Sequence, residues 1–230
     1  MTGTILVRGG GHPDPAPFFT HLVGLAGRSQ PRVLYVPTAA GNPDASVRLV
    51  YDQVIAAGGV PRTLNFFAPV PVDLDAALSE ADIVYVGGGN TRSMLAVWRT
   101  WGFDTALRRA WERGAVLSGG SAGGLCWFEA GTTDSWAGPL RAIEGCIGLL
   151  PGSHCPHYDG EVQRRPTYHR MVADGTLAAG YALDDAAVMQ FRGTMLETVW
   201  TLKPGSTAYR VERSEDGSHE TALEALPFPG

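Results

Sequence analysis

A serine between glycines is the feature of this sequence best suited to covalent chemistry. Residues 119–123 read Gly-Gly-Ser-Ala-Gly, after the apolar strand-like run 115–118 and before the apolar segment 125–128, which we expect to be helical. A G-x-S-x-G turn between a strand and a helix lifts its serine hydroxyl above the edge of the sheet. The glycines permit this sharp turn because a Cβ atom on either side would clash. We therefore predict that Ser121 is a nucleophile; the alternative is a glycine-rich turn whose serine only caps a helix.

A nucleophilic serine needs hydrogen-bond donors for the negative charge that develops on the attacked carbonyl oxygen. The free N–H of Ala122, at the start of the expected helix, would face this oxyanion. A second glycine-rich loop, Gly-Gly-Gly-Asn-Thr at 87–91, follows another strand-like run and lacks the ending of a phosphate-binding loop. Because loops after neighbouring parallel strands meet at one sheet edge, Gly88 or Gly89 is our candidate for the second donor, with Gly88 preferred. The alternative is an ordinary turn before a helix capped by Asn90 or by the threonine after it.

The proton acceptor that such a serine requires is most often a histidine. The chain has six histidines, and their positions alone do not choose among them: His12, His21, His154, His157, His169 and His219. His154, Cys155 and His157 lack a matching further ligand at the spacing of known zinc sites. We therefore predict neither a bound metal nor another cofactor.

The segments that must position these residues alternate between short apolar runs and helical patterns. Runs of short, β-branched residues without polar alternation predict strands that are covered on both faces: 4–7, 32–37, 60–66, 83–86 and 115–118. Apolar residues at helical spacing between Asn42-Pro43 and Gly58-Gly59 predict a helix. This alternation predicts βαβ units and an α/β fold with a doubly wound, mostly parallel sheet and helices on both faces.

The pattern changes after about residue 180. Segments 187–191, 195–200 and 207–211 are strand-like and are separated by glycine- and proline-containing turns. We expect antiparallel strands on the edge of the same sheet, within a single domain that spans residues 1–230. The proline-rich segment 226–230 is expected to be a loose tail.

Composition argues against several classes of partner. The 230 residues carry a formal net charge of −5, so no basic excess favours nucleic acid. No apolar run approaches the roughly 20 residues that cross a membrane, and the start lacks the pattern of a signal peptide. Three cysteines without paired spacing, Cys126, Cys146 and Cys155, indicate buried thiols in a reducing compartment. We therefore expect a cytoplasmic protein that binds neither nucleic acid nor membrane.

Three motifs occur in the order found in the peptidase E (alpha-aspartyl dipeptidase) family: Val-Gly-Gly-Gly-Asn-Thr at 86–91, Gly-Ser-Ala-Gly at 120–123 and Pro-His at 156–157. The sequence resembles that family along nearly its whole length, from the first strand to the edge strands. The resemblance implies a class I glutamine-amidotransferase-like α/β fold, a Ser-His-Asp/Glu triad and a relationship to cyanophycinase. It also implies that His157 is the base.

The third member of that triad is less directly indicated. Thr132-Thr133-Asp134 looks like the segment of the family that carries the acid, which makes Asp134 the candidate. Glu129, expected at the end of the helix after the elbow, is the alternative, since either carboxylate could hold the imidazole tautomer. Asp159 lies too close to His157 in sequence to orient it easily.

An exopeptidase must also recognise a charged end of its substrate. Arg164, Arg165 and Arg170 follow His157 and could clamp a peptide carboxylate, although a solvated helix start is the alternative reading. Arg165, Arg170 and Asn90 are therefore our candidate substrate-binding residues. We predict a serine exopeptidase that hydrolyses small peptides, with Asp-X dipeptides as candidate substrates and a homodimer as a candidate assembly.

Three other functions compete with this one. An α/β-hydrolase esterase would use Ser121, Asp184 or Asp185, and His219, in the chain order of that fold. It would also be expected to have a His-Gly-Gly-Gly oxyanion motif after an early strand, which this sequence lacks. A cyanophycinase-like peptidase would need a groove for a polymer, for which no segment is evident. A non-catalytic binding protein of the same fold would have no need for the intact elbow.

Overall fold

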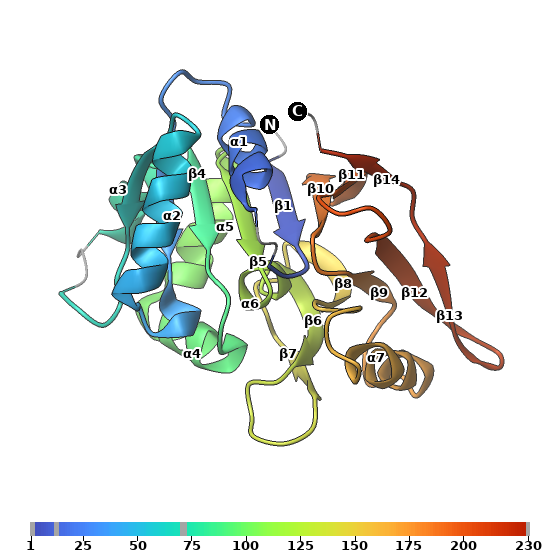
Figure 1. Ribbon diagram of the computed structural model, residues 1–230. Coiled ribbons are helices and arrows are strands. Elements are labelled where there is room, and N and C mark those ends of the chain that lie inside the picture. Colours follow the sequence, from blue (N-terminus) through green and yellow to red (C-terminus); the bar gives the residue numbers. More distant parts are fainter. Residues whose placement is uncertain (1–2, 12–13, 70–72, 229–230) are drawn as a thin grey trace.

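The computed structural model describes residues 3–11, 14–69 and 73–228, which form two β-sheets and their covering helices (Figure 1). The larger sheet has the strand order β14-β11-β10-β1-β5-β4-β2-β3. Its parallel part consists of β1 (Thr4–Arg8), β5 (Val116–Gly120), β4 (Ile83–Val86), β2 (Arg32–Val36) and β3 (Val60–Thr63). These are the five strands predicted from the first half of the sequence, which confirms the α/β class.

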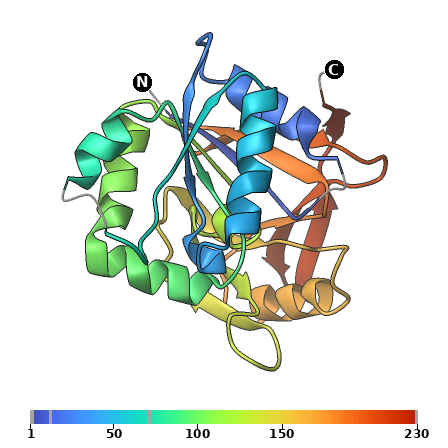
Figure 2. The same cartoon turned by 60° about the vertical axis from the view of Figure 1, so that its left-hand side comes forward.

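Helices cover both faces of this parallel region. Alternate strand residues point to opposite faces: Ile5 and Val7 join the core under α3 (Leu74–Ser79), α4 (Thr91–Trp101) and α5 (Phe103–Glu112). Leu6 joins a second core under α1 (Ala16–Gly24) and α2 (Asp44–Ala56). Figure 2 shows the two blue helices on one side of the sheet and the green helices on the other. A short 3-10 turn, η1 (Thr38–Ala40), follows β2.

Antiparallel strands extend the larger sheet beyond β1, as predicted. β10 (Ala187–Arg192) runs antiparallel to β1, and β11 (Met195–Thr201) runs antiparallel to β10. The end of the chain differs from the expected loose tail, because β14 (Ala225–Pro227) pairs with β11. Its backbone hydrogen bonds tie residues 225–227 to the sheet; residues 229–230 lie outside the described part.

A second sheet, not anticipated from the sequence, has the order β13-β12-β9-β8-β6-β7. Its strands are β6 (Phe128–Thr133), β7 (Arg141–Glu144), β8 (Leu150–Cys155), β9 (Gly180–Leu183), β12 (Ala208–Ser214) and β13 (Gly217–Ala222). One face contributes Phe128 and Leu150 to the larger core, and the other packs against α7 (Arg164–Ala173). The segment 207–211, expected at the edge of the first sheet, therefore belongs to the second.

The helix after the elbow is also shorter than predicted. α6 spans only Ala122–Leu125, and Phe128 already begins β6. A short apolar run is compatible with either a buried helix or a buried strand, and here pairing with β7 and β8 decides for the strand. The consequence is that the second sheet starts within a few residues of Ser121.

Candidate active site

Ser121 occupies the turn between β5 and α6 in a strained conformation. Its φ of 54° and ψ of −120° lie outside the regions that residues with a Cβ prefer, and its side chain caps no helix N–H. A Cβ at Gly119 would overlap the backbone of Gly123, and one at Gly123 would overlap the carbonyl of Val86. Close backbone packing therefore holds the turn, and the serine is not a simple helix cap.

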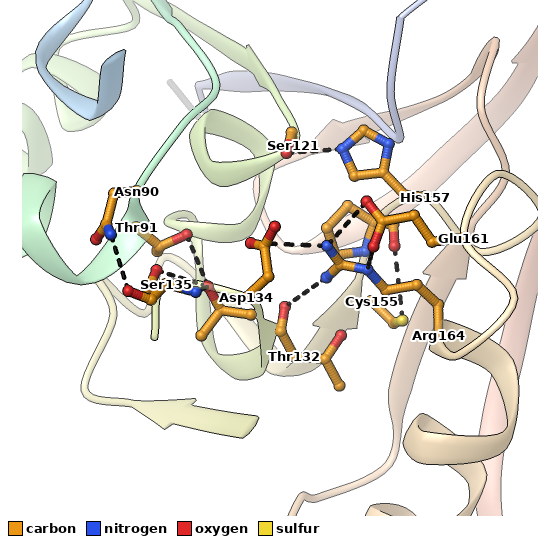
Figure 3. A network of polar contacts seen from close by, with 12 residues as sticks. Asn90, Thr91, Ser121, Thr132, Asp134, Ser135, Cys155, His157, Glu161 and Arg164 are labelled. Atoms are coloured by element: carbon orange, nitrogen blue, oxygen red, sulfur yellow. Dashed lines mark hydrogen bonds and ion pairs between the residues drawn. The ribbon is translucent and has the colours of Figure 1, made fainter. Parts of the chain in front are cut away.

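His157 lies two residues after β8 and faces Ser121 (Figure 3). Its Nε2 is 2.8 Å from Ser121 Oγ, and its Nδ1 is 2.8 Å from Asp185 Oδ1. Because a carboxylate oxygen only accepts, Nδ1 carries the proton and donates to Asp185, and Nε2 is left to accept the bond from the Ser121 hydroxyl. This is the protonation pattern that a general base needs before it removes a serine proton.

Asp185 lies in the turn between β9 and β10, where two backbone segments enclose its side chain. Gly10 and Gly160 pack so closely against the carboxylate that a Cβ at either position would overlap it. The Asp185 N–H donates to Asp159 Oδ1 at 2.7 Å, which fixes the turn. The side chain is 35% exposed, so the carboxylate is oriented by the backbone but still reached by solvent.

The geometry corrects the predicted third member of the triad. Asp134 is 64% exposed and lies 3.8 Å from a guanidinium nitrogen of Arg164. Glu129 lies in β6 and accepts a 2.8 Å hydrogen bond from the Gly152 N–H. Neither carboxylate is hydrogen-bonded to His157, whose Nδ1 is already paired with Asp185. Asp185 replaces them as the candidate acid.

The arrangement of Asp185 also separates this site from the α/β-hydrolase alternative. That alternative paired Asp184 or Asp185 with His219, but His219 lies in β13 and its Nε2 is 3.2 Å from Thr221 Oγ1. The observed chain order is serine, histidine, aspartate, whereas α/β-hydrolases have the histidine last. We therefore set the esterase alternative aside.

The two predicted oxyanion donors flank Ser121. Ala122 is the first residue of α6, and the first N–H groups of a helix have no partner within it. A Cβ built on Gly88 would lie 3.3 Å from Ser121 Cβ, so the loop after β4 passes directly beside the nucleophile. This position requires a residue without a bulky side chain and leaves backbone N–H groups next to the reacting centre.

Asn90 has a structural task at the start of α4. Its Oδ1 accepts a 2.9 Å hydrogen bond from the Ser93 N–H, and its Nδ2 donates to the Ser135 carbonyl at 2.9 Å (Figure 3). The side chain thus caps the helix, which was the alternative reading, and ties the loop after β4 to the loop after β6. Its predicted contact with substrate stays a prediction.

The three arginines of the segment 164–170 differ in their surroundings. Arg164 is buried and donates from Nε to Glu161 Oε2 at 2.7 Å. Arg165 donates to Glu220 at 2.8 Å and packs over a tyrosine ring, and Arg170 lies exposed in the last turn of α7. Two of the three are thus bound by carboxylates of the chain itself, so their role in binding substrate also stays a prediction.

The other described histidines are engaged elsewhere. His154 is fully buried, and its Nδ1 is 3.0 Å from the Tyr181 carbonyl. Burial lowers the pKa of His154 to about 3, so it is neutral over the physiological range. His21 bonds to Gln190 and His169 bonds to Glu220; His12 lies outside the described residues.

The cysteines are free thiols within the fold. Cys126 and Cys155 are buried and Cys146 is partly so. Burial raises the pKa of Cys155 to about 12, so this thiol is protonated. Over residues 3–11, 14–69 and 73–228, no three His, Cys, Asp or Glu side chains are grouped as a metal site.

The sequence did contain one overlooked signal for the acid. Asp185 precedes a predicted antiparallel edge strand, which must start at the edge where the parallel strands end. A third glycine-rich loop, at 9–11, follows β1 at that same edge. Together they indicate close backbone packing around an acidic residue near the nucleophile.

A serine on a strained turn, a histidine within hydrogen-bond reach and a carboxylate behind it form the arrangement used by serine hydrolases. Comparison with known proteins agrees with that class. A model of Peptidase family S51 matches residues 5–199, and the chain belongs to this family. It is therefore a serine peptidase.

Similar proteins carry related names. The chain is 42% identical over 230 residues to the "Uncharacterized peptidase YgaJ" of Bacillus subtilis (strain 168), covering 99% of this chain and 98% of that protein. It is 31% identical over 128 residues to "Peptidase E" of Citrobacter koseri, covering 50% of this chain and 53% of that protein.

Solved structures share the fold. A peptidase from an acI-B1 actinobacterium aligns with a TM-score of 0.72 at 18% identity, over 98% of this chain and 95% of that one. A putative peptidase E protein from Listeria monocytogenes EGD-e aligns with a TM-score of 0.65, also at 18% identity, over 88% and 100% of the two chains. No helix within the described residues has the length and apolar character needed to span a bilayer.

Proposed function

We propose that this chain is an exopeptidase that hydrolyses small peptides through an acyl-enzyme on Ser121. The observation that carries the proposal is the chain of two 2.8 Å hydrogen bonds from Ser121 through His157 to Asp185. His157 Nε2 removes the hydroxyl proton as Ser121 Oγ bonds to the scissile carbonyl carbon. Asp185 holds the imidazole tautomer and stabilises the imidazolium that forms.

The proton that His157 takes from Ser121 is later donated to the leaving amine. The tetrahedral oxyanion accepts hydrogen bonds from the N–H groups of Gly88 and Ala122. His157 then donates its proton to the leaving amine, and the carbon–nitrogen bond breaks to leave the acyl-serine. A water molecule, deprotonated by the same histidine, releases the carboxylic acid and restores Ser121.

The proposed substrate class is a peptide of two or three residues, with Asp-X dipeptides among the candidates. The likeness to a protein named peptidase E supports this choice. A cytoplasmic location, a homodimer and a single domain over residues 1–230 are further predictions that accompany this function.

Labelling with a fluorophosphonate probe tests the nucleophile. We expect one label per chain on Ser121 and none on Ser121→Ala, whose kcat should fall on the order of 10⁴-fold or more. Ser135→Ala is the matched control, because Ser135 lies at the same edge but its hydroxyl bonds to Thr133. An active, unlabelled wild type or an active Ser121→Ala variant would contradict the mechanism.

Substrate size is tested separately. A library of di- and tripeptides should contain substrates that are cleaved, while casein stays intact under the same conditions. Efficient digestion of casein would overturn the exopeptidase assignment but leave the mechanism standing.

A further inference from the structure

Arg8 brings a positive charge beside the candidate nucleophile. It is the last residue of β1, and its carbonyl accepts the Ser121 N–H at 3.2 Å. In the sheet it is paired with Gly120, and a Cβ on that glycine would lie 3.2 Å from Arg8 Nε. The guanidinium therefore lies against the strand end that carries Ser121, on the face of the sheet covered by α1 and α2.

The Arg8 guanidinium has unused hydrogen-bonding capacity. Its Nε is buried without a hydrogen-bond partner, and Nη2 makes one long contact of 3.4 Å with Tyr85 Oη. In the described part of the chain no carboxylate pairs with it, whereas Arg164 and Arg165 each bond to a glutamate. An arginine is always charged, and a buried donor without an acceptor is costly, so this guanidinium would stabilise an anionic group that reached it.

Aromatic residues fix the guanidinium in place. Its carbon lies 4.9 Å from the centre of the Phe18 ring, a cation–π contact. Tyr85 packs against Phe18 and stacks on Tyr35, with ring centres 5.7 Å apart. A Cβ on Gly87 would lie 2.8 Å from the Tyr35 hydroxyl. The row of aromatic rings formed by Phe18, Tyr85 and Tyr35 therefore links Arg8 to the candidate oxyanion loop.

We propose that Arg8, assisted by the Tyr85 hydroxyl, binds a carboxylate of the peptide substrate next to the scissile bond. This inference rests on the proposed peptidase function and adds a residue that the sequence motifs do not indicate. The planar fork of a guanidinium matches a carboxylate with two parallel hydrogen bonds. In a dipeptide, only one carbon separates the C-terminal carboxylate from the leaving nitrogen, so a cation adjacent to Ser121 is well placed to select it.

The same chemistry could be offered by an acidic side chain on the residue that becomes the acyl group. Four substrates separate the two sources: Ala-Leu, Ala-Leu amide, Asp-Leu and Asp-Leu amide. In each pair of substrates, the wild type should have the higher kcat/KM for the peptide that carries the recognised carboxylate. Arg8→Met keeps the length of the side chain against Phe18 and removes the charge.

Arg8→Met should lower kcat/KM for the preferred substrate by about 10- to 100-fold, mainly through KM, because the contact exists in both ground and transition states. For the substrate without that carboxylate, kcat/KM should stay within about threefold of the wild-type value. Loss of the preference for free acid over amide identifies the α-carboxylate, and loss of the preference for Asp over Ala identifies the side chain. Arg8→Lys should recover part of the preference. Arg62→Met is the control, because Arg62 pairs with Glu80 on the exposed edge strand β3.

An equal loss on all four substrates, or no change on any, would overturn the role of Arg8 alone. If Arg8→Met does not fold, Arg8→Lys and Tyr85→Phe carry the same comparison. A wild type that cleaves none of the four peptides and nothing in the dipeptide library would overturn the proposed function, and this inference with it.

Discussion

Replacing Asp185 by asparagine tests the corrected triad directly. Asparagine keeps the size of the side chain but removes its charge and offers an amide that can donate to His157 Nδ1. The proton of the ring would then move to Nε2, which could no longer accept the hydroxyl proton of Ser121. Asp134→Asn is the matched comparison, because it makes the same chemical change on the carboxylate that the sequence favoured.

The structure sets the size of the two effects. In a Ser-His-Asp triad, loss of the acid costs on the order of 10⁴ in kcat, or about 5.5 kcal/mol. Asp185 makes a direct 2.8 Å bond to His157 but is 35% exposed, so water screens part of its charge. We expect a loss of about 10³- to 10⁴-fold for Asp185→Asn. Asp134, by contrast, is 64% exposed and makes only an ion pair of 3.8 Å. Such a contact is worth up to about 1 kcal/mol, so the kcat of Asp134→Asn should fall less than tenfold.

Three measurements make the comparison conclusive. Steady-state kinetics on one cleaved dipeptide give kcat and KM, the rate of fluorophosphonate labelling reports activation of Ser121, and thermal melting reports folding. Both variants should melt within a few degrees of the wild type, and only Asp185→Asn should be labelled slowly. If Asp134→Asn loses more kcat than Asp185→Asn, the reasoning from hydrogen-bond geometry is refuted.

Two further predictions use positions with built-in controls. Gly10→Ala should reduce kcat at least tenfold, because the new Cβ would displace Asp185. Gly11→Ala is the control and should behave as wild type, because its Cβ would meet nothing within 4 Å. Equal kinetics of the two variants would contradict this packing. His154 should make stability depend on pH: its pKa of about 3 in the fold lies below the unfolded value of about 6.5, so the folded state binds fewer protons and loses stability as the pH falls below 6.5. Between pH 7.5 and pH 5, His154 should account for a loss of about 2 kcal/mol in the free energy of unfolding. Urea unfolding of His154→Phe should therefore show a weaker dependence of stability on pH than the wild type. An unchanged dependence would contradict this prediction.

The parallel half of the fold was predictable because its signals are local. Each strand is a short β-branched run, and each connection carries its own turn or cap residues, as at Asn90 before α4. The weaker strand at 60–66 became β3 at the sheet edge, where a proline is tolerated. The second sheet was missed because its strands between residues 128 and 183 are short and contain glycine and polar residues. Their pairing partners lie far away along the chain, and no local pattern reveals them.

The choice of acid failed for the same physical reason. Asp134 was favoured by its place in a motif, whereas the partner of His157 is decided by which loops meet in space. β10 lies beside β1 and runs antiparallel to it, so that Val188 pairs with Arg8. The turn before β10 therefore reaches the edge where Ser121 lies. Antiparallel edge strands were foreseen, but their place next to β1 was not.

The site draws its parts from both sheets, which makes its geometry depend on how they are joined. Ser121 follows a strand of the larger sheet, and His157 follows a strand of the smaller one. Asp185 lies in the turn by which the chain passes from β9, in the smaller sheet, to β10, in the larger one. A shift between the sheets would separate serine from histidine before it separated histidine from aspartate. Because Gly10 follows β1 and packs on Asp185, the larger sheet also contacts the acid directly. The close backbone approach at that glycine therefore holds the base and the acid in register with the nucleophile.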